Sequence, residues 1–209
     1  IDPFFAEYWL DVCETHGWEL EQVWLTHSHW DHSKGVEGLA DRQVWVHSKE
    51  SERGWEGPSN REWDNAANSH VIQTIGALEI EAHCTPGHTP GHMTFIGEGV
   101  VVSGDCMFLG RCGRTDLFGG DIQSQRSSLL YLRKHLKSIP GGWLVLPGHQ
   151  YKLPDGTNPT YISVDELLIN NEALKALDDD LKWNALDFLA FDDSLAEKAR
   201  RESARAQNL

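Results

Sequence analysis

The stretch THSHWDH, residues 26–32, constrains this chain more than any other feature, because it places three histidines and one aspartate within seven residues. It overlaps the end of the apolar run QVWLT, residues 22–26, which predicts a short buried strand. Polar side chains directly after a buried strand are typical of functional sites on a rigid scaffold. Taken alone, the stretch fits either a metal-binding loop or a hydrophilic turn that is rich in histidine.

Three later segments repeat this placement of potential ligands. VVVSGD ends at Asp105, WLVLPGH ends at His149, and the Gly/Pro turn TPGHTPGH, residues 85–92, contains His88. Chance does not readily put so many imidazoles and carboxylates at the ends of elements. Imidazole and carboxylate suit zinc, iron or manganese, so the combined pattern predicts a metal site.

The order of the predicted elements indicates an α/β fold. Helices are expected over residues 4–19, 35–42, 121–138 and 164–180, and further strands over 43–47, 70–75, 77–83 and 93–99. Residues 49–69 have several glycines and many polar groups, and are expected to form an irregular insertion. Strands that alternate with helices predict layers with the sheet inside and the helices outside.

Composition narrows the classes of partner. The formal net charge of −14 argues against nucleic acid and against anionic membrane surfaces. No apolar run approaches the roughly 18 residues of a spanning helix, and no signal peptide is visible. Cys13, Cys84, Cys106 and Cys112 have no CxxC pairing, which favours a reduced, cytoplasmic setting. The oligomeric state is left open, with a dimer as one possibility.

These motifs together resemble the metallo-β-lactamase-fold hydrolases, and within them the glyoxalase II (hydroxyacylglutathione hydrolase) and persulfide dioxygenase branches. The resemblance runs from about residue 1 to residue 151. It implies an αββα sandwich of two mixed sheets flanked by helices. Residues 1–160 would form the metal-binding domain, and residues 161–209 a C-terminal helical segment and tail of the same domain. The family carries strands ahead of a segment like IDP at residues 1–3, so we expect those N-terminal strands to be missing here.

The resemblance also implies two metal ions, with zinc expected and iron or manganese as alternatives. The first ion would be bound by His27, His29 and His88, the second by Asp31, His32 and His149, and Asp105 would bridge both. Two divalent ions about 3.5–4 Å apart can hold a bridging water that ionises near neutral pH. The resulting hydroxide attacks a carbonyl, and Asp31 and Asp105 are expected to act in catalysis by holding it.

Substrate contacts are implied at two positions. Arg114 in CGRTD and Tyr151 in GHQY match residues that contact the glutathione moiety in glyoxalase II. Arg114 could hold a substrate carboxylate by a bidentate contact, or it could pair with Asp116 to fix its own loop. Glyoxalase II has an aromatic residue where this chain has Asp116, and its C-terminal basic glutathione-binding residues are not recognisable here. The carrier therefore need not be glutathione.

Two enzyme classes follow from these motifs. The first is a dinuclear metal hydrolase that cleaves a thioester or related small ester. The alternative is a non-haem iron persulfide dioxygenase, which would use His27, His88 and Asp105 as a facial triad. A β-lactamase or a non-catalytic binding protein is less favoured, because the motifs belong to the thioester branch and the ligand set is complete.

The remaining histidines and cysteines are expected to be structural. His92, the second histidine of the turn, should support the site without binding metal, and Cys106 should face away from the ligand side as a packing residue. Four more histidines have no ligand context and are expected to be ordinary solvent-facing or hydrogen-bonded residues: His16, His70, His83 and His135.

Overall fold

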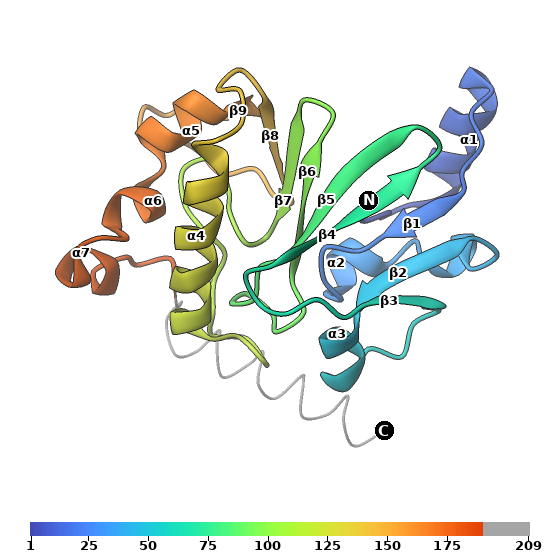
Figure 1. Ribbon diagram of the computed structural model, residues 1–209, viewed down its shortest axis with the longest axis horizontal. Helices are drawn as coiled ribbons and strands as arrows, with labels where there is room; N and C mark the ends of the chain where they lie inside the picture. Colours follow the sequence, from blue (N-terminus) through green and yellow to red (C-terminus); the bar gives the residue numbers. More distant parts are fainter. Residues whose placement is uncertain (190–209) are drawn as a thin grey trace. The chain divides into compact units, whose positions relative to one another are not determined.

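The computed structural model describes residues 1–189, and residues 190–209, which hold the predicted tail, lie outside the described part. The chain divides into two units, Ile1–Asp64 and a second that begins at Asn65 (Figure 1). Within residues 1–189 we find no helix with the length and apolar character needed to cross a membrane. The predicted domain boundary at residue 160 stays a prediction.

The first unit is built on a three-stranded sheet in the order β1-β2-β3, and both strand pairings are parallel. Its elements are α1 (Ala6–His16), β1 (Gln22–Trp24), α2 (Trp30–Ser33), the 3₁₀ helix η1 (Glu37–Leu39), β2 (Gln43–His47), α3 (Ser48–Glu52) and β3 (Arg61–Trp63). The core gathers the buried apolar residues of β1, β2 and the loops beside them, including Leu25 and Val36. Thr26–His32 therefore begins where a buried strand ends, as predicted.

The second unit holds a six-stranded sheet in the order β4-β5-β6-β7-β8-β9. Its strands are β4 (His70–Ile75), β5 (Leu78–Cys84), β6 (Met93–Gly97), β7 (Val100–Gly104), β8 (Leu144–Pro147) and β9 (Ile162–Ser163). The sheet is mixed, because β7 and β8 run parallel while every other neighbouring pair is antiparallel. The carboxyl ends of β7 and β8 thus meet at one edge.

Helices cover one side of this second sheet (Figure 1). They are α4 (Ile122–Leu136), α5 (Val164–Asn170), α6 (Glu172–Ala176) and α7 (Asp180–Asn184). Leu129, Leu132 and Leu136 recur at helical spacing on α4, and all three are buried against residues of β7, β8 and α5. At the start of α4, the Asp121 side chain accepts a hydrogen bond from the Ser124 amide, which satisfies an N–H that the helix itself leaves unpaired.

Two local predictions were wrong. The helix expected over residues 35–42 is only the three-residue turn η1, and the two glycines in this segment, Gly35 and Gly38, are poor helix formers. The expected irregular insertion at 49–69 contains both α3 and β3. The His47 ring accepts a hydrogen bond from the Lys49 amide and so starts α3, while β3 pairs with β2.

Candidate metal centre

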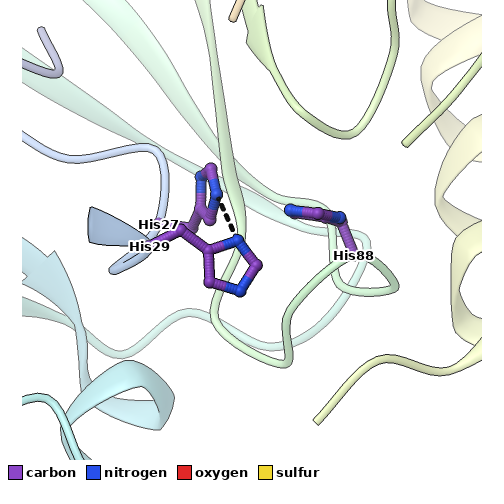
Figure 2. Close-up of side chains that lie close together, drawn as sticks. All are labelled: His27, His29 and His88. Carbon is purple, nitrogen blue, oxygen red and sulfur yellow. Dashed lines mark hydrogen bonds between the residues drawn. The ribbon is translucent and has the colours of Figure 1, made fainter. Parts of the chain in front are cut away.

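His27 and His29 lie side by side in the loop after β1. Nε2 of His27 is 3.0 Å from Nδ1 of His29, and the two rings meet nearly edge to face (Figure 2). Two donor atoms on one tetrahedral zinc ion, each about 2.05 Å from the metal, are about 3.3 Å apart. The pair that the sequence predicts to share one ion is therefore nearly at that spacing.

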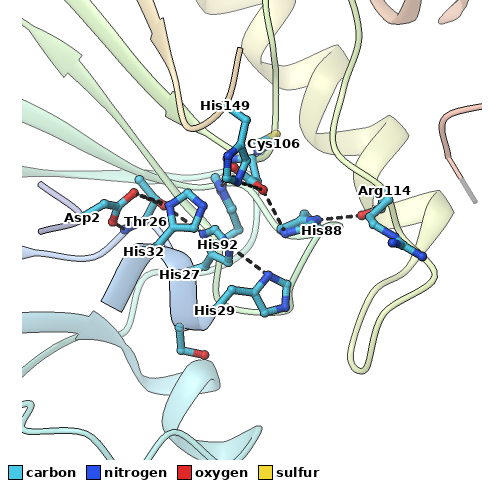
Figure 3. Close-up of polar contacts among 12 residues, drawn as sticks. Asp2, Thr26, His27, His29, His32, His88, His92, Cys106, Arg114 and His149 are labelled. Atoms are coloured by element: carbon cyan, nitrogen blue, oxygen red, sulfur yellow. Dashed lines mark hydrogen bonds and ion pairs between the residues drawn. The ribbon is translucent and has the colours of Figure 1, made fainter. Parts of the chain in front are cut away.

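The Asp2 carboxylate orients the histidines of this loop. It accepts hydrogen bonds from the amide and the hydroxyl of Thr26, both at 2.7 Å, and lies 2.9 Å from Nδ1 of His32 (Figure 3). The Thr26 hydroxyl, which donates to Asp2, can only accept from Nδ1 of His27, 3.0 Å away. Both imidazoles then carry their proton on Nδ1 and present the Nε2 lone pair, which is how outer partners prepare metal ligands.

Asp31 and His32 sit in the first turn of α2, with Asp31 exposed and His32 buried. The ring centroids of His27 and His32 are 4.1 Å apart. The first unit thus gathers His27, His29 and His32 at one point, with Asp31 next to them in the chain. Sequence reasoning identified all four but not Asp2, which lies more than twenty residues away with no motif of its own.

Glu50 and Arg53, also missed from the sequence, surround the residues between the histidines. The buried Glu50 carboxylate accepts hydrogen bonds from the amide and hydroxyl of Ser28, and Arg53 donates to the Ser28 hydroxyl and to Nε2 of His29 at 2.8 Å. Burial lowers the pKa of Arg53 from its ordinary value, an effect that the nearby Glu50 charge opposes. Both residues come from the segment predicted to be irregular.

The second unit gathers the other three predicted ligands. Asp105 follows β7, His149 follows β8, and His88 lies in the turn between β5 and β6. Oδ2 of Asp105 is 3.4 Å from Nε2 of His88 and 3.4 Å from Nε2 of His149. These distances exceed those of ordinary charge-assisted hydrogen bonds and match the spacing of donor atoms around a tetrahedral ion, about 3.3 Å.

Outer partners hold this second group as well. Nδ1 of His88 is 2.7 Å from the backbone carbonyl of Arg114, so it carries the proton and leaves Nε2 as the electron-pair donor (Figure 3). Nε2 of His92 accepts hydrogen bonds from the amides of Asp105 and Cys106, at 3.0 and 3.1 Å. The structural role predicted for His92 is confirmed, because this ring fixes the backbone that carries Asp105.

The predicted substrate residues lie in this unit. Nε and an amino nitrogen of Arg114 donate to the two carboxylate oxygens of Asp116, at 2.5 and 2.6 Å, so the pairing considered from the sequence is present. Tyr151 is partly exposed, and its ring contacts Phe108 and the guanidinium of Arg111. A pocket beside it is lined by Gly110, Arg111, Tyr151, Lys152, Leu153, Pro154 and Glu172. Arg111 and Lys152 belong to no recognised motif, so the sequence did not predict them as pocket residues.

Three of the four cysteines are buried, and all four are free thiols. Burial raises the pKa of the Cys106 thiol to about 12 and raises that of Cys112 as well. A thiol that stays protonated is neither a nucleophile nor a metal ligand. The packing role predicted for Cys106 is confirmed.

Comparison with known proteins places this arrangement in a family. The model of the metallo-beta-lactamase superfamily matches residues 1–149. The hydroxyacylglutathione hydrolase of Pseudomonas fluorescens (strain SBW25) is 33% identical over 158 residues, 72% of this chain and 55% of that protein. This chain therefore spans about half the length of that relative.

Two solved structures extend the comparison. The B3 metallo-beta-lactamase BLEG-1 has a TM-score of 0.67 and 26% identity, covering 83% of this chain and 86% of that one. ETHE1 from Myxococcus xanthus has a TM-score of 0.63 and covers 100% of this chain and 87% of that one, but at 23% identity it supports the fold alone. The expected α/β fold, with mixed sheet and flanking helices, is confirmed. The chain belongs to the metallo-β-lactamase superfamily, whose members bind metal ions, and it resembles the hydroxyacylglutathione hydrolase branch.

Proposed function

We propose that this chain is a metal-dependent hydrolase that cleaves a thioester or related small ester with two divalent ions, zinc in the first instance. Membership of the superfamily supports metal binding, and the 33% identical hydrolase supports this branch. The observation that carries the proposal is the position of Asp105, whose Oδ2 lies 3.4 Å from a ring nitrogen of each of two histidines. A carboxylate so placed is suited to bridge two ions.

We assign the ligands as the motifs indicate. His27, His29 and His88 would hold the first ion, Asp31, His32 and His149 would hold the second, and Asp105 would serve both. The tautomers support this assignment for three of the histidines, since His27, His32 and His88 each have a partner at Nδ1 that leaves Nε2 to donate.

When bound, the two ions would polarise the substrate carbonyl and lower the pKa of a water between them. The contribution of the chain is orientation. Asp2 and Thr26 hold the imidazoles of the first unit, and His92 holds the backbone at Asp105. The carboxylates of Asp31 and Asp105 would offset part of the charge of bound ions and could accept a hydrogen bond from the attacking water. No protein nucleophile is needed.

The substrate is inferred to be a small thioester with an anionic carrier. The pocket beside Tyr151 contains the cations of Arg111 and Lys152, which suit a carboxylate. Arg114 would have to exchange its bidentate contact with Asp116 for a substrate carboxylate, so we give Arg111 the larger part in binding. Free thiols favour a cytoplasmic enzyme, and the oligomeric state stays open.

The test combines metal analysis with two assays. Protein purified without added metal should contain two zinc-type ions per chain and should hydrolyse a hydroxyacylglutathione thioester or a related small thioester. His88→Ala should lower the metal content and reduce kcat/KM by about 100-fold or more, because the ligand is lost. His16→Ala, at an exposed position on α1, serves as the matched control and should change neither value.

Two outcomes would overturn the proposal. A single iron per chain with oxygen consumption on a low-molecular-weight persulfide would identify a dioxygenase. If His88→Ala left both metal content and turnover unchanged, the ligand assignment itself would be wrong. Arg111→Met tests the proposed role of Arg111 in substrate binding. It should raise KM while leaving the metal content and kcat close to those of the parent protein.

A further inference from the structure

A second cluster of histidines lies in the second unit, outside the predicted ligand set. His70 and His83 are directly opposite each other on the antiparallel strands β4 and β5, and their ring centroids are 4.7 Å apart. His135 comes from the last turn of α4, with its ring 4.9 Å from that of His83 and 5.7 Å from that of His70. His70 is exposed and His83 is hydrogen-bonded, as expected from the sequence, but the sequence did not predict that the three rings lie together.

We propose that His70, His83 and His135 form a separate site for a zinc-type divalent ion, with three protein ligands and a fourth position left to solvent. One ring nitrogen from each imidazole lies within 4.8 Å of the others. Ligand atoms on a tetrahedral zinc ion are about 3.3 Å apart, so the rings must close by roughly 1.5 Å at most. His70 is exposed and His135 is half-buried, so both can make that rotation, while the buried His83 stays in place.

Glu81 and Tyr131 complete the surroundings of His83. Glu81 precedes His83 by two residues, so it points to the same face of β5, and its Oε2 is 2.8 Å from Nε2 of His83. The Tyr131 hydroxyl, one helical turn before His135, is 2.7 Å from Nδ1 of His83. Because a carboxylate only accepts, Nε2 of His83 carries the proton and Nδ1 is the electron-pair donor. Nδ1 of His70 lies on that same side, 3.5 Å from the Tyr131 hydroxyl. An ion would replace the Tyr131 hydrogen bond to Nδ1 of His83, and Glu81 would hold the ring as an outer partner.

The chemistry of the set selects the class of ion. Three imidazoles suit zinc, cobalt, nickel or copper, whereas magnesium and calcium prefer oxygen ligands. Burial keeps His83 uncharged near neutral pH, as a ligand must be. The ion would link β4, the edge strand of the sheet, to β5 and to α4. Its expected effect is therefore to hold the sheet edge in place.

The experiment counts Co²⁺ bound by the whole chain after chelator treatment, using equilibrium dialysis and the visible absorption of the bound ion. Comparison of the parent protein with His70→Gln/His135→Gln isolates this site, because the proposed catalytic ligands are unchanged in both. We expect one equivalent fewer in the variant. His16→Gln, another histidine substitution outside the cluster, is the matched control and should keep the full number.

A second arm separates this inference from the proposed function. His88→Ala alters the proposed catalytic centre, and this variant should still bind the Co²⁺ equivalent assigned to the His70, His83 and His135 cluster. That equivalent should disappear when His70→Gln is added to His88→Ala. Co²⁺ should raise the midpoint of thermal unfolding less in the His70→Gln variant than in its parent. Equal stoichiometry and equal stabilisation in His70→Gln/His135→Gln and parent would overturn the inference. If that double variant does not fold, the single variant His70→Gln, at an exposed position, is tested instead by Co²⁺ stoichiometry and by the midpoint of thermal unfolding.

Discussion

At the scale of single residues, Asp2 has the widest influence on the histidine loop. Its two carboxylate oxygens accept from the Thr26 amide and hydroxyl and from His32, and its own amide donates to the carbonyl of Trp24. Asp2 adopts a φ of 48°, in the left-handed region that aspartate tolerates better than most residues. One side chain thus sets the tautomers of two predicted metal ligands.

Replacement of Asp2 by Asn should weaken metal binding without unfolding the loop. The amide can still accept from Thr26, but it lacks the charge that keeps the His32 proton on Nδ1. We expect a 10–100-fold loss of metal affinity, about the effect of removing an outer partner, measured by competition with a chromophoric chelator. Asp41→Asn, at an exposed aspartate paired with Arg42, is the control and should bind as the parent does. An unchanged affinity in Asp2→Asn would contradict this role.

His83 makes stability depend on pH. Burial is the main cause that lowers its pKa to about 4 from an ordinary 6.5; the Glu81 carboxylate opposes this shift, and His135 and His70 add to it. The neighbouring Tyr131 hydroxyl bonds the same ring. Because the unfolded chain takes up this proton first, the stabilising contribution is complete above about pH 6.5 and is lost as pH falls towards 4.

The loss should be on the order of 3 kcal/mol across that window. Denaturant unfolding of metal-free protein at pH 7 and pH 4.5, compared between the parent and His83→Gln, measures it. The free energy of unfolding of the parent should fall more steeply than that of the variant. Parallel curves would show that His83 is not the group responsible.

At the scale of elements, α4 holds both chain segments that present ligands in the second unit. The Asp121 amide donates to the carbonyl of Gly87, the Ser128 hydroxyl donates to that of Pro86, and the Gln125 side chain donates to that of Cys106. The turn before His88 and the chain after Asp105 are thus bonded to one helix. Displacement of the start of α4 should disturb both ligands together.

Gly87→Ala tests this coupling. Gly87 has a φ of 148°, and a Cβ there would lie 2.3 Å from Cα of Gln125, which is backbone of α4 and cannot move aside alone. We expect a loss of about 1–3 kcal/mol in the free energy of unfolding, together with reduced metal content. Gly142→Ala, where a Cβ meets nothing within 4 Å, should change neither. If Gly87→Ala lowered the free energy of unfolding but kept its full metal content, the position of α4 would not control the ligands.

At the scale of the whole molecule, the burial of thiols gives a simple measure of the folded state. Cys84, Cys106 and Cys112 are almost entirely inaccessible, while Cys13 on α1 is half-buried. A disulfide reagent should therefore modify one of the four thiols rapidly in native protein and all four in denaturant. Cys13→Ser should abolish the rapid phase. Rapid modification of two or more thiols in the native state would contradict this packing.

Predictions from the sequence were most accurate where candidate metal ligands directly follow buried strands. THSHWDH and SGD stand where buried strands finish, and local pattern is sufficient to find them. The partners of those residues could not be found in the same way, because Asp2, Glu50 and Arg53 meet the loop through tertiary contacts with no spacing rule. A similar limit applies to α1: local spacing predicted the helix, but it did not show that Tyr8 and Trp9 would be exposed in the described chain.

The histidine cluster of the second unit illustrates the same limit at longer range. His70 and His83 become neighbours only through the register of β4 on β5, and a shift of one residue would place them on opposite faces. His135 then arrives on a helix that begins dozens of residues later. No local pattern contains that register, so each histidine looked ordinary by itself.

The parallel pairing of β7 with β8 has a consequence for how this chain can change its length during evolution or engineering. Gly104 is level with Pro147, and the Gly148 amide donates to the carbonyl of Gly104, so the ladder itself brings Asp105 and His149 together. The turn between α4 and β8 can therefore gain or lose residues without separating the two ligands. A single deletion inside β8 would instead turn every following side chain to the other face, so insertions and deletions should be tolerated in the turn and excluded from the strand.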